Sequence, residues 1–237
     1  AIAATILFPI AGILGNCGWR MPFWMYALSL ILALGVVLFT WEPEPDASAA
    51  SKNRASWAGF PWGHVMGVCG LTIVGAILFY VFALELSIAF TETGVTKPST
   101  IGLLTAMATL GVPVGTIFFR ALAGYSIGLL LTLEFVLIGG GFYLASHATD
   151  FRALMCAVMV NQLGSGMMLP TLLNWVMRPL RYVQRGRGTG FWMAAFNIGQ
   201  FCCVLVLSAL TRQTGGKLIP SLATLSYVAF AVAVGAL

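Results

Sequence analysis

Charged residues are scarce in this sequence. Only 8% of the 237 residues are charged, whereas 59% are hydrophobic. Soluble domains carry about 25% charged residues, so this deficit excludes an ordinary water-soluble domain and favours a protein that folds in lipid. The twelve basic residues outnumber the seven acidic ones, but they are scattered in short loops between apolar runs. That distribution is typical of membrane topology and argues against a nucleic-acid-binding surface.

Cysteine and histidine patterns that hold metals or form catalytic sites are also missing. The five cysteines lie almost entirely inside apolar runs, with no C-x-x-C pair, so we interpret them as small hydrophobic residues. His64 and His147 are the two histidines, and only Asp150, three residues after His147, is near either of them. We therefore expect no metal, no cofactor and no enzymatic activity.

The stretch from Asn161 to Phe201 organises the rest of the chain. It consists of an apolar run interrupted by Gly164, Gly166 and Pro170, a basic loop, and a second apolar run. The loop contains four arginines, Arg178, Arg181, Arg185 and Arg187. Two apolar runs around an arginine cluster predict a polytopic membrane protein with this loop in the cytoplasm.

Long apolar runs fill most of the remaining sequence. A membrane-spanning helix needs roughly 20 apolar residues, and seven runs approach that length. They are about Pro22–Trp41, Pro61–Phe90, 101–120, Ala121–Ser146, Ala153–Met177, Gly188–Leu210 and 218–237. The first run, Ala1–Leu14, is shorter, and the chain begins and ends within apolar runs. We therefore expect a fragment of a longer protein.

One stretch of different composition divides the chain. Residues 42–60 begin with Glu42-Pro43-Glu44-Pro45-Asp46 and continue with small and polar residues, which is the composition of a linker. We expect two membrane units, residues 1–41 and 61–237, on either side of it. If the arginine cluster is cytoplasmic, alternation of the spans places the linker in the cytoplasm, and Gly15–Arg20 and Thr91–Ser99 outside.

Local motifs resemble, in their order and spacing, the major facilitator superfamily of transporters. Gly18-Trp19-Arg20, followed by Pro22-Phe23, is similar to the entry into that family's sixth helix. Thr93-Gly94-Val95 with Ile101-Gly102 resembles the junction of helices seven and eight. The segment from Arg185 to Gly190, continuing to Gly199-Gln200-Phe201, resembles helix eleven of a subset of bacterial members.

The resemblance implies an all-α bundle that runs from the fifth helix through most of the twelfth. It implies secondary transport of a small solute by alternating access, in a bacterial inner membrane, by a protein that is monomeric when complete. The expected partners are lipid, a small-molecule substrate and protons. Pro9-Ile10-Ala11-Gly12 matches the family's exporter pattern only in part. Antiport-driven export of a partly apolar compound is favoured, and uptake of an organic metabolite is the alternative.

Two acidic residues inside predicted spans, Glu85 and Glu134, are candidates for proton coupling. A charge in a span costs about 2.5–3.5 kcal/mol on insertion scales, and an apolar setting favours the protonated carboxyl group. The resemblance implies that Glu85 lines the central cavity and that Glu134 is peripheral. The alternative is a solvated position at the outer mouth for Glu85 and an interhelical hydrogen bond for Glu134.

Further candidates for the substrate cavity are polar or aromatic. They are Tyr80, Phe82, Asn161, Gln162, Asn197 and Gln200. Side-chain amides in membranes often join helices instead of binding substrate, and aromatic residues often only pack, so both alternatives stay open.

Gating candidates are of two kinds. Gly164, Gly166 and Pro170 predict a bend, since glycine permits close helix approach and proline frees a backbone carbonyl. Arg185 and Arg187 are positioned to bridge to neighbouring loops in one transport state.

The rival classes of function are a non-transporting sensor or scaffold and a membrane-embedded enzyme, and substrate flux distinguishes a transporter from both.

Overall fold

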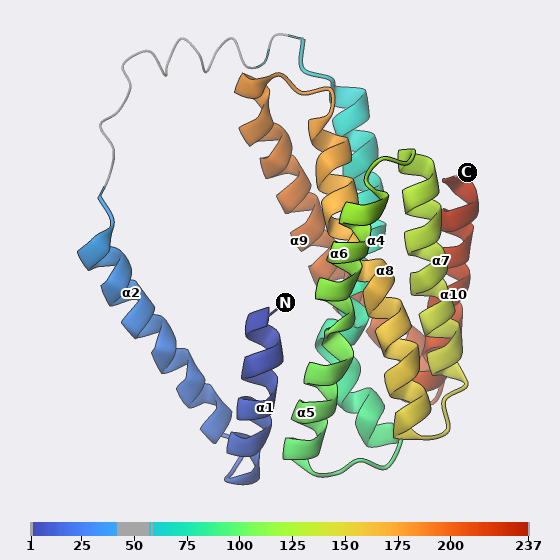
Figure 1. Ribbon diagram of the computed structural model, residues 1–237. Helices are drawn as coiled ribbons and strands as arrows, with labels where there is room; N and C mark the ends of the chain where they lie inside the picture. The colour runs from blue at the N-terminus through green and yellow to red at the C-terminus, as the bar shows by residue number, and fades with distance from the viewer. Residues whose placement is uncertain (1, 42–56, 58, 237) are drawn as a thin grey trace.

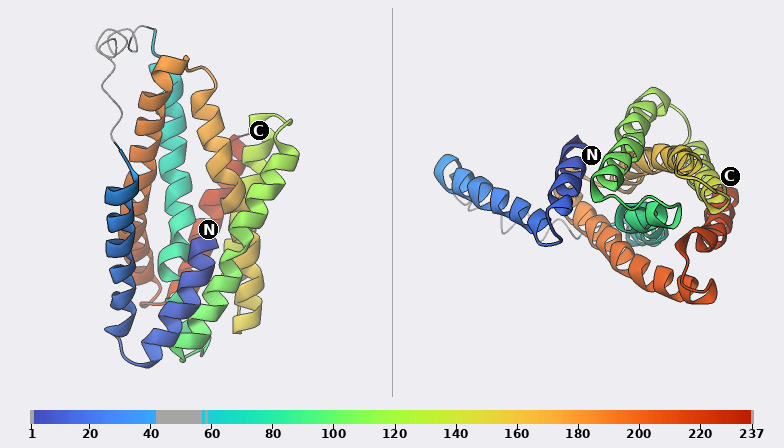
Figure 2. Two further views of the ribbon diagram at one scale, coloured as in Figure 1. Left: turned by 60° about the vertical axis from the view of Figure 1, so that its left-hand side comes forward. Right: turned by 90° about the horizontal axis from the view of Figure 1, so that it is seen from below.

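The structure is a computed structural model that describes residues 2–41, 57 and 59–236, and these fold into helices joined by short turns (Figure 1). The predicted linker, 42–60, lies outside the described residues apart from Trp57, Gly59 and Phe60. Before it come α1 (Ile2–Asn16), the 3-10 helix η1 (Met21–Tyr26) and α2 (Ala27–Phe39). None of the α2 residues is buried, and this helix stands apart from the others (Figure 2).

The second unit follows the linker and contains most of the mass. Its helices are α4 (Trp62–Glu92), α5 (Pro98–Thr109), α6 (Gly111–Leu122), α7 (Ile127–Ser146), α8 (Phe151–Met177), α9 (Tyr182–Gln213) and α10 (Leu218–Gly235). In the described part of the chain, seven helical segments are long and apolar enough to cross a membrane, with η1–α2 and α5–α6 each counted as one. This confirms the predicted all-α polytopic fold.

Two predicted span starts were wrong, and one further span is divided into two helices. The fifth span begins at Ile127 and not at Ala121, because residues 121–122 belong to α6. The fourth span is divided at Leu110, because Pro113 cannot donate the backbone hydrogen bond that would continue the helix. The seventh span begins at Tyr182 and not at Gly188, because the side chain of Gln184 accepts a hydrogen bond from the backbone N–H of Arg181 at 3.2 Å. Arg185 and Arg187 therefore lie in the first turns of α9 and not in a loop.

Helix α8 is the centre of the second unit. It packs against α4, α6 and α7, while α10 covers α7 and α9 covers α4. The buried core lies between these helices. Its largest fully buried side chains are Phe82, Phe90, Phe135, Phe142, Leu154, Met168 and Leu172.

Polar side chains fix several helix ends. Asp150 caps α8 by accepting a hydrogen bond from the backbone N–H of Ala153 at 2.7 Å. Glu92, at the end of α4, accepts hydrogen bonds from the backbone N–H groups of Leu218 and Ile219 at 2.6 and 2.9 Å. A carboxylate at a helix N-terminus is stabilising, and this one ties α4 to α10.

The helices define two ends of the molecule (Figure 1). We call the end with the turns after α6 and α8 and the start of α4 the arginine end, because Arg120, Arg178, Arg181, Arg185 and Arg187 lie there. The opposite end contains the turns after α1, α4, α7 and α9. This grouping of turns is the one that the alternation of spans predicts.

Candidate functional site

The first membrane unit touches the second through two glycines, Gly12 of α1 and Gly102 of α5. A Cβ atom on Gly12 would lie 2.6 Å from the carbonyl oxygen of Pro98, and one on Gly102 would lie 2.5 Å from that of Phe8. Only glycine lets two helix backbones approach this closely. The backbone N–H of Ser99 also donates a hydrogen bond to Oδ1 of Asn16 at 3.3 Å. The two units are thus closed against each other at the opposite end (Figure 2).

A cavity of about 380 Å³ lies beside this glycine contact. Its walls come from α1, α4 and α5, and they are apolar except for Ser87 and Thr105. Thr105 is only 8% exposed, and its hydroxyl has no hydrogen-bond partner among the described residues. Phe82 contributes to the wall while also packing on Phe142, with ring centroids 5.1 Å apart. The cavity suits a small apolar group that brings one hydrogen-bonding atom to Thr105.

An aromatic cluster joins α4 to α9. The ring of Phe196 lies 5.3 Å from that of Tyr80, 5.8 Å from that of Phe79 and 5.9 Å from that of Trp192. The indole N–H of Trp192, a residue only 6% exposed, also has no partner among the described residues. Tyr80 is therefore part of this aromatic cluster, and a substrate role for it stays a prediction.

The two acidic residues inside spans occupy different surroundings. Glu85 is half-buried. It lies five positions after Tyr80, about 140° around the helix, so the two side chains do not share a face. Glu134 is fully buried between α7 and α8, where the hydroxyl of Thr171 contacts its Oε1.

The contacts of Thr171 indicate a protonated Glu134. The same hydroxyl lies 3.0 Å from the carbonyl oxygen of Met167, yet a hydroxyl group has one hydrogen to donate. Both contacts are hydrogen bonds when Thr171 donates to Met167 and a protonated Glu134 donates to Thr171. The second carboxyl oxygen, Oε2, is buried and has no partner among the described residues, which also disfavours a charged carboxylate.

The predicted amide groups separate into two pairs. Asn161 is fully buried and donates a hydrogen bond to the carbonyl oxygen of Ile138 at 3.0 Å, and Gln162 lies against it at 3.5 Å. The Asn161 bond joins α8 to α7, and a substrate role for Asn161 and Gln162 stays a prediction. Asn197 is exposed and donates to Met193 of its own helix at 2.8 Å, while Gln200 is half-buried. A substrate role for Asn197 and Gln200 stays a prediction.

The gating candidates occupy tight contacts. Helix α8 is continuous through Pro170, and it approaches its neighbours at Gly164 and Gly166. A Cβ atom on Gly164 would lie 2.5 Å from the carbonyl oxygen of Glu134, and one on Gly166 would strike that of Val112. The glycines therefore serve close packing, and a hinge role stays a prediction.

Arg185 and Arg187, at the start of α9, make different contacts. The guanidinium of Arg187 lies 3.9 Å from the ring centroid of Trp57, whose ring stacks on Trp62 at 5.4 Å. Arg185 instead lines a cavity at the arginine end. Arg187 thus holds the residues just before α4 against α9, which no local pattern predicted.

A model of one family matches the chain. The Major Facilitator Superfamily model covers residues 1–201, which include the first unit, the glycine contact and the second unit as far as Phe201 in α9. Searches of curated proteins and of solved structures returned no match.

Proposed function

The chain belongs to the Major Facilitator Superfamily, and from that premise we propose a secondary transporter that moves a small solute by alternating access. Members of this family are membrane transporters and not enzymes. We assign residues 1–41 to the last two helices of a first bundle and residues 61–237 to a second bundle. We also propose a bacterial inner membrane, with the arginine end in the cytoplasm.

The contact between Gly12 and Gly102 carries the alternating-access proposal. It is a bare backbone contact between the two units, and it lies at one end of the membrane region. No salt bridge between described residues joins the two units there, so they can separate without breaking one. In our proposal this contact is the closed gate on the outer side, and it opens when the cytoplasmic ends come together.

The cavity beside the gate supports a partly apolar substrate. Its volume of about 380 Å³ and its apolar lining, with the Thr105 hydroxyl unpartnered among the described residues, suit a small compound with one polar group. We propose export of such a compound, in exchange for protons.

Proton coupling needs a carboxyl group that binds and releases a proton. Glu134 has the surroundings of a protonated carboxyl group, and the half-buried Glu85 is the second candidate. We propose Glu134 as the coupling residue.

The test uses the full-length protein in proteoliposomes with an imposed pH gradient and a panel of radiolabelled neutral, cationic and anionic compounds. We expect flux of at least one partly apolar compound against its gradient. Glu134→Gln should abolish this flux yet retain exchange of labelled for unlabelled compound, since the amide resembles the protonated acid. Binding without flux would contradict transport and support a sensor.

A further inference from the structure

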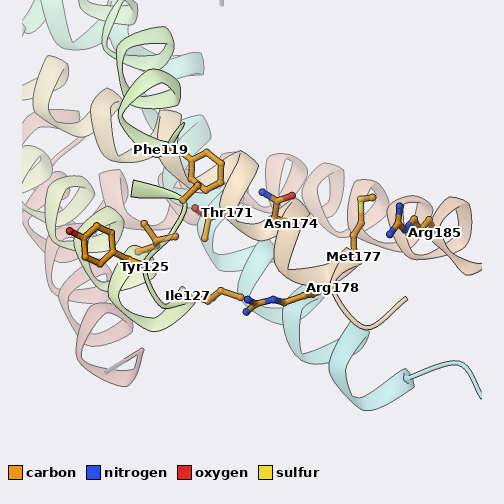
Figure 3. Close-up of a pocket in the computed structure, with 10 residues that line it drawn as sticks. Phe119, Tyr125, Ile127, Thr171, Asn174, Met177, Arg178 and Arg185 are labelled. Atoms are coloured by element: carbon orange, nitrogen blue, oxygen red, sulfur yellow. The ribbon is translucent and has the colours of Figure 1, made fainter. Parts of the chain in front are cut away.

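A second cavity lies at the arginine end, away from the glycine contact (Figure 3). Its volume is about 460 Å³, and its lining comes from α6, α7, α8 and α9. Leu130, Ile127 and Phe119 form apolar wall, and Thr171 also contributes. The proposed substrate cavity is a different one, although Thr171, the partner of Glu134, also lines this cavity.

Two arginines bring positive charge to this cavity. Arg178 extends over it toward Ile127, and Arg185 lies beyond Met177 (Figure 3). Neither guanidinium forms a hydrogen bond or an ion pair with another described residue. Arg187, by contrast, is engaged with Trp57. Two positive charges on the lining of one cavity, without a counter-charge among the described residues, favour a negatively charged ligand.

Neutral hydrogen-bonding groups complete the lining. The Asn174 side chain, which lines the cavity, makes no hydrogen bond to another described residue. Tyr125 also lines the cavity. Guanidinium groups present a planar set of donors that matches phosphate oxygens, often in pairs.

The position of the cavity explains its mixed lining. It lies around the last turns of α8 and the first turn of α7, where spans of this length reach the headgroup region. The lining joins two arginines and Asn174 to apolar side chains such as Ile127 and Leu130. A phospholipid combines the same chemistry, a phosphate joined to acyl chains, and basic pockets between membrane helices bind such headgroups.

We propose that this cavity binds a phosphate group, held by Arg178 and Arg185. The phosphate belongs either to an acidic phospholipid, whose acyl chains follow the apolar wall, or to a soluble phosphate compound. This site is separate from the substrate cavity, and it assigns the two arginines a ligand in addition to their topological role.

The experiment measures phosphatidylglycerol binding to the purified full-length protein by native mass spectrometry, with phosphatidylcholine as the zwitterionic comparison. We expect one tightly held phosphatidylglycerol, and we expect Arg178→Gln/Arg185→Gln to weaken its binding at least about tenfold. The matched control, Arg152→Gln/Arg212→Gln, removes two exposed arginines at the opposite end and should leave binding unchanged. Arg178→Lys/Arg185→Lys keeps the charge and should weaken binding less.

A competition arm identifies the source of the phosphate. Displacement of phosphatidylglycerol by millimolar inorganic phosphate would support a soluble ligand, whereas retention of the lipid would support a phospholipid. The proposal is overturned if Arg178→Gln/Arg185→Gln binds phosphatidylglycerol as tightly as the parent and the control variant do. It is also overturned if phosphatidylcholine binds to the parent as tightly as phosphatidylglycerol does. A correctly inserted variant is recognised by its unchanged melting temperature, since Arg181 and Arg187 remain.

Discussion

Glycine contacts within the second unit and the glycine contact between the units use the same geometry in different surroundings. Gly115 and Gly166 bring α6 and α8 together so closely that a Cβ atom on either would strike the backbone of the other helix. Gly12 and Gly102 do the same for α1 and α5. In both places the helices approach until their backbones touch.

The neighbours of the two contacts differ. Helix α8 itself contributes fully buried core residues, such as Leu154, Met168 and Leu172. Gly12 and Gly102 instead join α1 to α5, which lie on either side of residues 42–60. The first contact lies within one unit, whereas the second lies between the two units that the proposed mechanism moves against each other. We infer that the same glycine geometry builds a rigid bundle in one place and a gate in the other.

The largest effect is expected inside the bundle. Gly166→Leu places a side chain against the backbone of Val112, and relief requires α6 and α8 to separate. We expect at least about 3 kcal/mol of destabilisation, measured as loss of folded protein and a lower melting temperature. Gly190→Leu is the matched control, because nothing lies within 4 Å of that glycine's added Cβ. Equal melting of the two variants would contradict a rigid α6–α8 contact.

A smaller effect is expected at the gate, and it concerns conformation instead of folding. Gly102→Leu should hold α1 and α5 apart and favour the state that is open at the opposite end. Labelling of a cysteine introduced at Ser99 should then rise about tenfold, which corresponds to about 1.4 kcal/mol. Gly35→Leu, in α2 with open space around its added Cβ, is the control. Loss of folded protein in the Gly102 variant would place this contact in the same class as Gly166.

The fully buried Glu134 and the half-buried Glu85 give a third comparison. Glu134→Gln should lower pH-driven flux about tenfold or more and retain exchange, because the proton-binding step is removed. Thr171→Val should alter the pH dependence of flux through loss of the hydroxyl contact. Glu85→Gln should leave coupling intact. If only Glu85→Gln abolished coupling, the coupling residue would be Glu85 of α4 and not Glu134.

The smallest effect is expected for the amides. Asn161→Ala removes the hydrogen bond to Ile138 in the bundle and should cost about 1 kcal/mol, a typical value for polar contacts between membrane helices. Asn197→Ala, on an exposed face, should change the melting temperature little. A greater loss of stability with Asn197 would mean that α9 is packed more tightly than its exposure indicates.

The sequence predicted which segments are helices better than it predicted which side of each helix is buried. The length and hydropathy of the apolar runs predicted spans such as α7 and α8. Ser126 caps α7 and Asp150 caps α8, and each accepts a hydrogen bond from a backbone N–H of the first turn. Lipid-facing and core-facing positions are both apolar, however, so periodicity does not separate them. The burial of Asn161 and Glu134 therefore became evident only from the structure.

Candidate residues far apart in sequence were hardest to predict. Gly12 and Gly102 are separated by many residues, and no local pattern shows that they meet. The cavity with Arg178 and Arg185 likewise combines four helices. By contrast, the difference between Tyr80 and Glu85 follows from helix geometry alone, since five positions turn a side chain about 140°.

Disulfide trapping at the gate tests alternating access most directly. Asn16→Cys and Ser99→Cys would join α1 to the start of α5 where Ser99 already donates to Asn16. Cys17, Cys156 and Cys202 are replaced by serine, because they are accessible at least in part. We predict that oxidation of the full-length protein stops flux, that reductant restores it, and that the single-cysteine variants are unaffected. Undiminished flux by the cross-linked protein would show that α1 and α5 do not separate during transport, and would contradict the proposed gate.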